Sequence, residues 1–448
     1  MKKNLQTLSF LFLIVLSGAH LRVLGQAKPL LPLADQQSEK IAQLQNDPKI
    51  TADAAFKLLT DWNNYPDLKA TGKDYTWFYQ DATFGKVPMR VYIPTNYRNN
   101  KKSPCILMLH GAEGGVRFGD IDSLNKADDL YDVFKSLMDE GYIIIRPVAD
   151  RSKKFDWAVN KWRDQPNLTY QAINNMLISL KRVLNIDDNK VFAFGHSDGS
   201  DGATGLGVYD PQPYAGIVAY NSMLTNIFAR DFYIRNTANR PFYEVHSDLD
   251  DLRPMLQTRE IINALKSNDD NILYKEYLGY AHQDKHLLID RPRVVGFMQQ
   301  TKRDPFHSKI WWETNSLTYN SCDWLTITQL KGDTKPAVWS KPFNVKSYNK
   351  IEKKFTDDLY YELATTTSAV KATYANNAFD IQTSRVGALE VKISPLMVDL
   401  KKPVRVLVNG KEVYNGLVKA DKQYLVNSFN ANFDKEVLWV NAVKVVVN

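Results

Sequence analysis

The sequence predicts an α/β fold, in which a doubly wound, mostly parallel β-sheet is followed by a smaller unit of β-strands. Between residues 75 and 303, apolar runs of strand type alternate with segments of helical period, which is typical of a parallel sheet covered by helices on both faces. Beyond about Lys302 no long helical period returns, and short β-type runs separated by turns take over. The 448 residues exceed one ordinary domain, so we expect two globular units.

The amino-terminal segment has the layout of a secretory signal peptide. Lys2 and Lys3 are basic, residues 8–16 are apolar, and small residues lead to Gln26. We expect residues 1–26 to be removed and the mature protein to be secreted or periplasmic, without stable insertion in a membrane. The apolar core falls short of the ~20 residues that a membrane helix needs. Retention of the segment as an uncleaved anchor is the alternative.

Residues 27–74 should form a helical arm. Residues 36–62 carry helix-forming side chains with apolar positions such as Ile41 and Leu59, and Pro48 should divide them into two short helices. We expect this arm to pack on the doubly wound unit.

The doubly wound unit should begin as strand, turn and strand between Tyr75 and Ile93 and then alternate strands with helices. Each later strand is expected at a short, nearly continuous apolar run, the pattern of a strand buried on both faces. The expected strands are 104–109, 142–146, 191–194, 215–219, 241–245 and 272–277, and the expected helices are 127–140 and 169–184.

Residues 304–448 should form an all-β accessory domain. Residues 310–314 and 324–327 are β-type runs. Residues 404–414 then give a strand, the dipeptide Asn409-Gly410 and a second strand, which is the strongest short-range signal for a β-hairpin.

Charge and cysteine content narrow the function classes. The 57 Lys and Arg against 50 Asp and Glu give a net charge of +7, and loss of the three basic residues of the leader lowers it to +4. The sequence has no block of like charge and no basic stripe with interleaved aromatics, so nucleic acid is not an expected partner, whereas an acidic polymer is acceptable. Cys105 and Cys322 alone cannot build a disulfide framework.

A candidate nucleophile follows the strand expected at 191–194. Residues 195–199 read Gly-His-Ser-Asp-Gly, a Gly-x-Ser-x-Gly pentapeptide centred on Ser197. A serine on a sharp strand-to-helix turn takes a strained conformation with little room beside it, which is why glycine stands two residues before and two residues after it. A glycine-rich turn can also give this pentapeptide by chance, so its surroundings must decide.

The loop after the strand at 104–109 is a candidate oxyanion hole. It reads His110-Gly111-Ala112 and continues with two more glycines, which let the backbone turn inward and present N–H groups. We expect the backbone N–H groups of Ala112 and Asp198 to stabilise the oxyanion. An ordinary glycine-rich turn is the alternative.

The acid and the base of a triad follow the last two expected strands. Asp248, Asp250 and Asp251 come after the strand at 241–245, and His282 comes after the strand at 272–277. The order Ser, Asp, His is one of three chain orders known for the same triad geometry.

On these motifs, residues 75–298 resemble the α/β-hydrolase superfamily. Within it they resemble secreted bacterial esterases related to feruloyl and acetylxylan esterases, polyhydroxyalkanoate depolymerases and dienelactone hydrolases. The resemblance covers about half of the chain and implies a serine esterase that needs no cofactor. Such esterases commonly carry the acid in a His-Gly-x-x-Asp-x-x-Val-Pro pattern, which places it at Asp250. Ser247 and Arg253 depart from the Gly and the Val of that pattern, and this leaves Asp248 and Asp251 open.

Substrate contacts are expected on the loop that follows the strand at 142–146. This loop should reach over the carboxyl ends of the strands, where open α/β sheets bind ligands, so Trp157 and Trp162 could contact a ring or a sugar. Packing of the loop onto the domain is the alternative for both residues. Asn221, after the strand at 215–219, is a further expected pocket edge.

No metal is expected at His282 and His286. They stand four residues apart, but Gln283 follows the first histidine where the zinc-protease pattern has its glutamate.

The expected activity is that of a secreted serine carboxylesterase, acting on small esters or on acyl or feruloyl groups of a polysaccharide. A serine peptidase of the prolyl-oligopeptidase type shares the triad order, but the segment before Tyr75 is too short for its propeller. A carbohydrate-binding protein with an inactive hydrolase fold is the other alternative, and the intact Ser, Asp and His set argues against it.

The β-rich residues 304–448 should supply no catalytic group. Their expected polymer contacts are exposed aromatics among Trp311, Trp312, Trp324 and Trp339.

Overall fold

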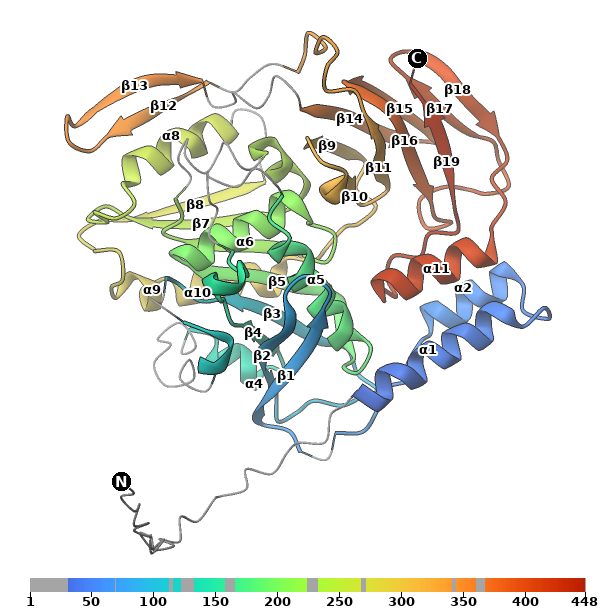
Figure 1. The fold of residues 1–448 in the computed structure, drawn as a ribbon, viewed down its shortest axis with the longest axis horizontal. Helices are drawn as coiled ribbons and strands as arrows, with labels where there is room; N and C mark the ends of the chain where they lie inside the picture. The colour runs from blue at the N-terminus through green and yellow to red at the C-terminus, as the bar shows by residue number, and fades with distance from the viewer. Residues whose placement is uncertain are drawn as a thin grey trace, which may run out of the picture.

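The protein consists of two units that lie side by side, joined to a helical arm (Figure 1). We call residues 73–301 the doubly wound unit and residues 304–447 the β-rich unit. The computed structural model describes residues 31–68, 70–112, 116–121, 133–157, 166–223, 233–266, 271–340, 344–359 and 367–447. The expected signal peptide at 1–26 and Trp162 lie outside these residues. None of the described helices has the length and apolar character that crossing a membrane requires.

The doubly wound unit is built on an eight-stranded sheet with strand order β1-β2-β4-β3-β5-β6-β7-β8. β2 is antiparallel to both of its neighbours, whereas every neighbouring pair from β4 to β8 is parallel, as the alternation of the sequence predicts. The strands are β1 (Lys73–Asp81), β2 (Gly85–Ile93), β3 (Ser103–Leu109), β4 (Ile143–Pro147), β5 (Ile186–His196), β6 (Gly216–Tyr220), β7 (Phe242–Ser247) and β8 (Ile272–Tyr277).

Both faces of this sheet are buried because side chains along each strand alternate between two apolar clusters. In β3, for example, Leu107 and Leu109 belong to one cluster, and Ile106 and Met108 belong to the other. The first cluster is covered by α5 (Thr169–Lys181), α6 (Asp198–Tyr209) and α8 (Met255–Lys266), and the second by α4 (Lys135–Asp139), α9 (His286–Ile289) and α10 (Arg291–Gln300).

Helix α4 is shorter than the helix expected at 127–140, part of which falls on residues 122–132, outside the described residues.

The β-rich unit packs a five-stranded sheet, β18-β17-β15-β14-β9, against a four-stranded one, β10-β11-β16-β19, around a separate apolar core. Asn409 and Gly410 both have positive φ, at 51° and 80°, in the turn between β17 and β18, as the Asn-Gly signal predicts. The strands are β9 (Lys309–Thr314), β10 (Ser321–Cys322), β11 (Leu325–Leu330), β14 (Ser368–Ala375), β15 (Ala378–Ser384), β16 (Val386–Ile393), β17 (Val404–Val408), β18 (Lys411–Gly416) and β19 (Asn441–Val446).

The β-rich unit is not all-β, because it contains the helix α11 (Lys422–Asn432). The Asp421 side chain caps the amino end of α11 by accepting a hydrogen bond from the Tyr424 N–H. Leu425 and Phe429 are buried on one face, and their spacing of four residues is the helical signal that the sequence carries here.

The helical arm packs on α11, not chiefly on the doubly wound unit as expected. Its helices are α1 (Leu31–Asn46) and α2 (Ala52–Thr60), separated near Pro48 as predicted. Ile41 and Leu59 share an apolar cluster with Phe429 of α11. The reason is that α11 presents an apolar face which the two β-sheets do not cover.

Two of the four tryptophans expected as polymer contacts are core residues. Trp312 and Trp324 are fully buried in the core of the β-rich unit, where Trp312 lies on the inward face of β9 and Trp324 lies in the turn between β10 and β11. Trp311 and Trp339 are partly exposed, and the Lys371 ammonium lies 3.9 Å and 5.0 Å from the centres of their rings.

Buried ion pairs connect the two units. Arg240, just before β7, binds both carboxylate oxygens of Asp323 at 2.8 and 2.6 Å, and each residue is 2% exposed. Arg303, in the short connection between the two units, binds Asp434 in the same bidentate manner at 2.6 and 3.0 Å and also donates to the Gln212 carbonyl of the doubly wound unit at 2.8 Å. These buried charges would lose their partners if the units separated.

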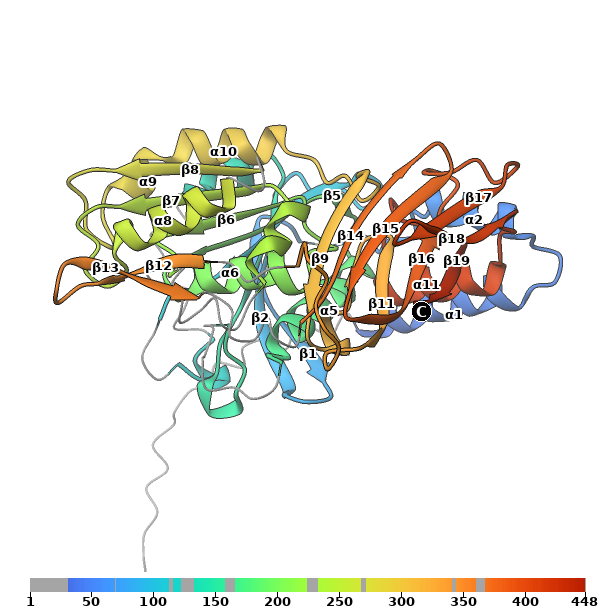
Figure 2. The same cartoon turned by 90° about the horizontal axis from the view of Figure 1, so that it is seen from above.

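A hairpin of β12 (Asn344–Asn349) and β13 (Lys354–Leu359) lies along α8 of the doubly wound unit (Figure 2). The buried Gln257 side chain of α8 donates to the Lys346 carbonyl at 2.9 Å and accepts from the Tyr348 N–H. The Lys350 ammonium at the hairpin turn donates to the carbonyl of Asp251. A segment inserted between strands of the β-rich unit therefore reaches a loop of the doubly wound unit.

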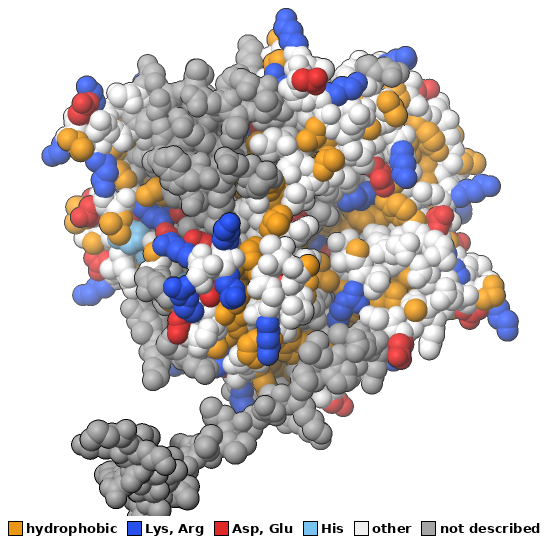
Figure 3. All heavy atoms as spheres, viewed as in Figure 1, with side chains coloured by type: hydrophobic (Ala, Val, Ile, Leu, Met, Phe, Trp, Pro, Cys, Tyr) orange, Lys and Arg blue, Asp and Glu red, His pale blue; other side chains and the backbone are white. Residues whose placement is uncertain are grey.

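Charges are mixed on the face that Figure 3 shows. Among the described side chains of that face, Lys and Arg are interspersed with Asp and Glu, and no basic stripe gathers there.

Candidate active site

Ser197 lies on a sharp turn between β5 and α6, with φ 58° and ψ −126°. A Cβ added to Gly195 would lie 2.0 Å from the Gly199 carbonyl, and one added to Gly199 would lie 2.0 Å from the Leu109 carbonyl oxygen. Only glycine fits at these two positions, as the pentapeptide predicts. The close approach of β3, β5 and α6 therefore holds the serine at the carboxyl edge of the parallel strands.

Ser197, His282 and Asp250 form one hydrogen-bonded chain. The Ser197 Oγ is 2.9 Å from His282 Nε2, and His282 Nδ1 is 2.7 Å from Asp250 Oδ2. A neutral imidazole that donates from Nδ1 to the carboxylate accepts the serine hydroxyl at Nε2. The structure thus brings together, on loops after β5, β7 and β8, the three residues that the sequence proposes as nucleophile, acid and base.

The candidate oxyanion loop lies against the nucleophile turn. A Cβ added to Gly111 would be 3.5 Å from Ser197 Cβ, so the loop carrying Ala112 passes directly beside the serine. Asp198 is the first residue of α6, where the backbone N–H has no acceptor within its own helix. Both predicted donors therefore lie next to the serine, and the glycines at 114 and 115 lie outside the described residues.

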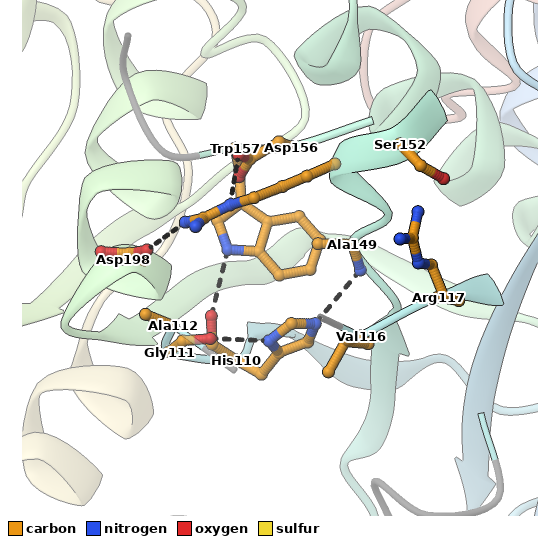
Figure 4. Close-up of a pocket in the computed structure, with 11 residues that line it drawn as sticks. His110, Gly111, Ala112, Val116, Arg117, Ala149, Ser152, Asp156, Trp157 and Asp198 are labelled. Carbon is orange, nitrogen blue, oxygen red and sulfur yellow. Dashed lines mark hydrogen bonds and ion pairs between the residues drawn. The ribbon is translucent and has the colours of Figure 1, made fainter. Parts of the chain in front are cut away.

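A cavity of about 290 Å³ opens next to these donors (Figure 4). His110, Gly111, Ala112, Trp157 and Asp198 are among the residues that line it. The indole of Trp157 is 1% exposed and donates to the His110 carbonyl at 3.0 Å, so Trp157 forms a fixed wall. The remaining lining residues are Val116, Arg117, Ala149, Arg151, Ser152 and Asp156.

Comparison with known proteins gives matches of structure only. No family model and no curated protein matches the sequence. Among solved structures, a thermostable esterase matches at 16% identity over 51% of this chain and 63% of its own, less than two thirds of its length, with a TM-score of 0.43.

Two further matches cover nearly the whole of the compared protein. An S-formylglutathione hydrolase from Agrobacterium tumefaciens matches at 13% identity over 53% of this chain and 98% of its own, with a TM-score of 0.41. A ferulic acid esterase from Anaeromyces mucronatus matches at 15% identity over 54% of this chain and 94% of its own, with a TM-score of 0.37. Peptidases also match.

The strand order, the serine turn between β5 and α6, and the Ser, Asp, His order along parallel strands agree with the resemblance found in the sequence. The doubly wound unit has the α/β-hydrolase fold.

Within this α/β-hydrolase fold, hydrogen bonding singles out Asp250 among the three aspartates. The Asp248 side chain instead accepts a hydrogen bond from the Gly279 N–H. Asp251 contacts Lys350 through its backbone carbonyl. Burial would raise the pKa of Asp250, but hydrogen bonds from His282, from Asn221 and from the Arg253 backbone outweigh it and lower that pKa to about 2. The carboxylate that faces His282 therefore stays ionised at neutral pH.

Asn221 lies behind the acid and not at the pocket edge that the sequence suggests. It is fully buried, with a φ of 53°. Its Nδ2 donates to Asp250 Oδ2 at 2.8 Å and to Ser247 Oγ at 2.7 Å, and its Oδ1 accepts from His286 Nε2 at 3.0 Å. The satisfied amide explains the burial, and it orients the carboxylate.

Three histidines near His282 are held neutral. Burial lowers the pKa of His196, His246 and His286 to about 4 in each case. His196 Nε2 donates to the His282 carbonyl at 2.9 Å, and His246 Nε2 donates to the Arg253 carbonyl at 2.7 Å. These side chains fix the loops of the base and the acid, and they leave His282 as the imidazole that faces the serine.

One cluster outside this site, His307, Cys322 and Asp323, has the spacing of metal ligands in the described residues. Asp323 is already bound by Arg240 through both oxygens and by His307 at 2.8 Å. An ion there would have to displace a buried guanidinium, so these residues do not fit a metal site.

Proposed function

We propose that the protein is a secreted serine carboxylesterase that hydrolyses carboxylic esters through an acyl-enzyme on Ser197. The observation that carries this proposal is the hydrogen-bonded chain from Ser197 Oγ through His282 to the ionised Asp250. The signal-peptide layout of the sequence supports export.

Each catalytic step uses one of these contacts. His282 Nε2 takes the serine proton as Oγ attacks the ester carbonyl carbon, and Asp250 stabilises the imidazolium that forms. The N–H groups of Ala112 and Asp198 bind the oxyanion, and each such donor is worth ~2.7–4 kcal/mol. His282 then protonates the leaving alkoxide, the alcohol departs, and water deprotonated by His282 releases the acid from Ser197.

The cavity beside the oxyanion donors favours a small acyl group or a single aromatic ring. Its volume of about 290 Å³ lies just below the ~300–1,000 Å³ that sites for drug-sized molecules occupy. Its fixed indole wall at Trp157 suits a planar or short acyl chain. We propose acyl or feruloyl groups of a polysaccharide as the natural substrate class.

Turnover of a panel of esters tests this proposal. The mature protein is assayed on chromogenic esters of graded chain length, acetylated xylan, methyl ferulate and a matched peptide amide. We expect turnover of short-chain esters or methyl ferulate, its loss in Ser197→Ala, and its retention in Ser179→Ala, whose hydroxyl donates to the Met176 carbonyl of its own helix. Faster cleavage of the amide than of every ester would contradict the proposal and favour a peptidase.

A further inference from the structure

Arg253 connects the loop of the catalytic acid to the nucleophile turn. It stands where the esterase pattern has a valine, and it is only 4% exposed. Its backbone N–H donates to Asp250 Oδ1 at 2.8 Å. Its guanidinium Nη1 donates to the Ser197 carbonyl at 3.1 Å, so one residue contacts both the acid and the nucleophile's backbone.

The same guanidinium compensates two carboxylates of α6. Nη1 donates to Asp201 Oδ1 at 2.8 Å, and Nη2 donates to Asp198 Oδ1 at 2.7 Å. Asp201 is 3% exposed and has lost its hydration, so it depends on this cation. Arg151 binds the second oxygen of Asp198 at 2.9 Å, but the Arg151 side chain is 62% exposed and therefore more strongly screened.

The charge of Asp198 matters because of where this residue lies. It follows Ser197 directly, and its own backbone N–H is a proposed oxyanion donor. A carboxylate without a counter-ion at this position would oppose the negative charge that develops on the substrate oxygen. Of the two described arginines that contact the Asp198 carboxylate, Arg253 is buried and Arg151 is exposed.

We infer that Arg253 is a positioning residue, which locks the acid loop to the nucleophile turn and neutralises Asp198 and Asp201 beside the oxyanion hole. This inference rests on the proposed function and deepens it. The planar fork of arginine reaches three acceptors at once, whereas a lysine ammonium on a flexible stem supplies the charge without that geometry. A valine, as in the esterase pattern, could supply neither.

Three variants separate positioning from simple support of the fold. Arg253→Ala should lower kcat by about 100-fold, with a much smaller change in KM, because the loss falls on the transition state. Arg253→Lys should lie between Arg253→Ala and the wild type. Arg303→Met is the matched control, since Arg303 is also 4% exposed and pairs bidentately with Asp434, far from the serine turn. It should lower Tm and leave kcat unchanged.

Chemical rescue distinguishes positioning from a purely structural role, because a purely structural role predicts no recovery of kcat on addition of guanidinium. Millimolar guanidinium chloride should restore several-fold of the lost kcat in Arg253→Ala, and sodium chloride at the same concentration should not. The inference is overturned if folded Arg253→Ala keeps the wild-type kcat, or if guanidinium restores nothing. If Arg253→Ala does not fold, a lowered kcat in folded Arg253→Lys supports the inference, and a wild-type kcat there overturns it.

Failure of the proposed function would look different. It would appear in the wild type as the absence of ester turnover and of phosphonate labelling at Ser197, whatever the Arg253 variants do.

Discussion

Asp250 is defined as the candidate acid by its hydrogen bonds. One carboxylate oxygen accepts from His282 and Asn221, and the other accepts from the backbone N–H groups of Leu252 and Arg253. Four donors around one carboxylate fix both its charge and its direction. The pattern in the sequence favours Asp250 but leaves Asp248 and Asp251 open, because the hydrogen bonds that distinguish them come from three loops.

Substitution of this acid should disable catalysis without unfolding the protein. In Asp250→Asn the amide favours the wrong tautomer of His282, so we expect kcat to fall by about 10⁴-fold while Tm changes little. Asp248→Asn and Asp251→Asn are the matched controls and should retain most of the activity in steady-state ester assays. Equal losses in all three variants would show that the acid lies elsewhere.

A buried glutamate beside the site should make stability depend on pH. Burial raises the pKa of Glu244 from its ordinary 4.5 to about 8, although the hydrogen bond from Ser222 lowers it. Between these two values the unfolded chain releases a proton that the folded protein keeps, so the free energy of unfolding falls as pH rises. Burial raises the pKa of Asp201 from its ordinary 3.8 to about 6. Between these two values Asp201 also makes the free energy of unfolding fall as pH rises.

Urea unfolding at pH 5, 6, 7 and 8 measures this dependence. In Glu244→Gln the decline toward pH 8 should be shallower than in the wild type. Glu140→Gln, at an exposed glutamate, serves as the control and should follow the wild type. Parallel curves for the wild type and Glu244→Gln would contradict the prediction.

At the scale of elements, the nucleophile turn depends on the close approach of β3, β5 and α6. In Gly195→Ala the new Cβ would collide with the Gly199 backbone, which cannot move without displacing Ser197. We expect the free energy of unfolding to fall by at least ~1–3 kcal/mol. We also expect kcat/KM to fall by about 100-fold, since a 1 Å misplacement of a reacting group costs that much.

A glycine in an open position provides the control for this prediction. Gly296 lies within α10, and nothing lies within 4 Å of a Cβ added there. Gly296→Ala should therefore stabilise the protein by ~0.5–1 kcal/mol and leave activity unchanged. A Gly195→Ala variant that matched Gly296→Ala in both Tm and kcat/KM would show that the turn is not tightly packed.

Elements with a strong local pattern could be predicted from the sequence, and elements formed by contacts between distant segments could not. The apolar runs of β3 and β5 and the Asn-Gly turn after β17 each carry their own signal. The candidate triad can be predicted from the sequence for the same reason, because each member follows such a strand. The contact of Asn221 with Asp250 and the contact of Arg253 with the nucleophile turn could not be predicted from the sequence, since the partners lie on other loops. The helix α11 was missed among β-type runs, although its apolar spacing is helical.

At the scale of the whole molecule, the two units are tied more closely than two independent modules would be. Buried ion pairs lie at the junction, and the β12–β13 hairpin extends from the β-rich unit to the loop of the candidate acid. The helical arm joins α11 at the far end of the chain. These arrangements bring together residues that lie between 83 and 375 positions apart in the chain, so no local pattern could predict them.

Breaking the junction should destabilise the protein without touching the chemistry. Asp323→Asn leaves the buried Arg240 without its counter-charge, which typically costs about 3–5 kcal/mol. The exposed pair of Arg405 and Glu412 provides the control, and Glu412→Gln should leave Tm unchanged. Both variants should keep the wild-type kcat/KM on a small ester at temperatures where they are folded. A normal Tm for Asp323→Asn would contradict the buried junction.

The identity of the nucleophile can be measured directly. The mature protein is incubated with a fluorophosphonate, digested, and searched by mass spectrometry for the modified residue. If Ser197 is activated by His282, a single adduct should form on Ser197. It should disappear in Ser197→Ala, form far more slowly in His282→Ala, and be much less affected in His286→Ala. An adduct on another serine together with retained turnover in Ser197→Ala, or an active esterase that forms no adduct, would contradict the proposed mechanism.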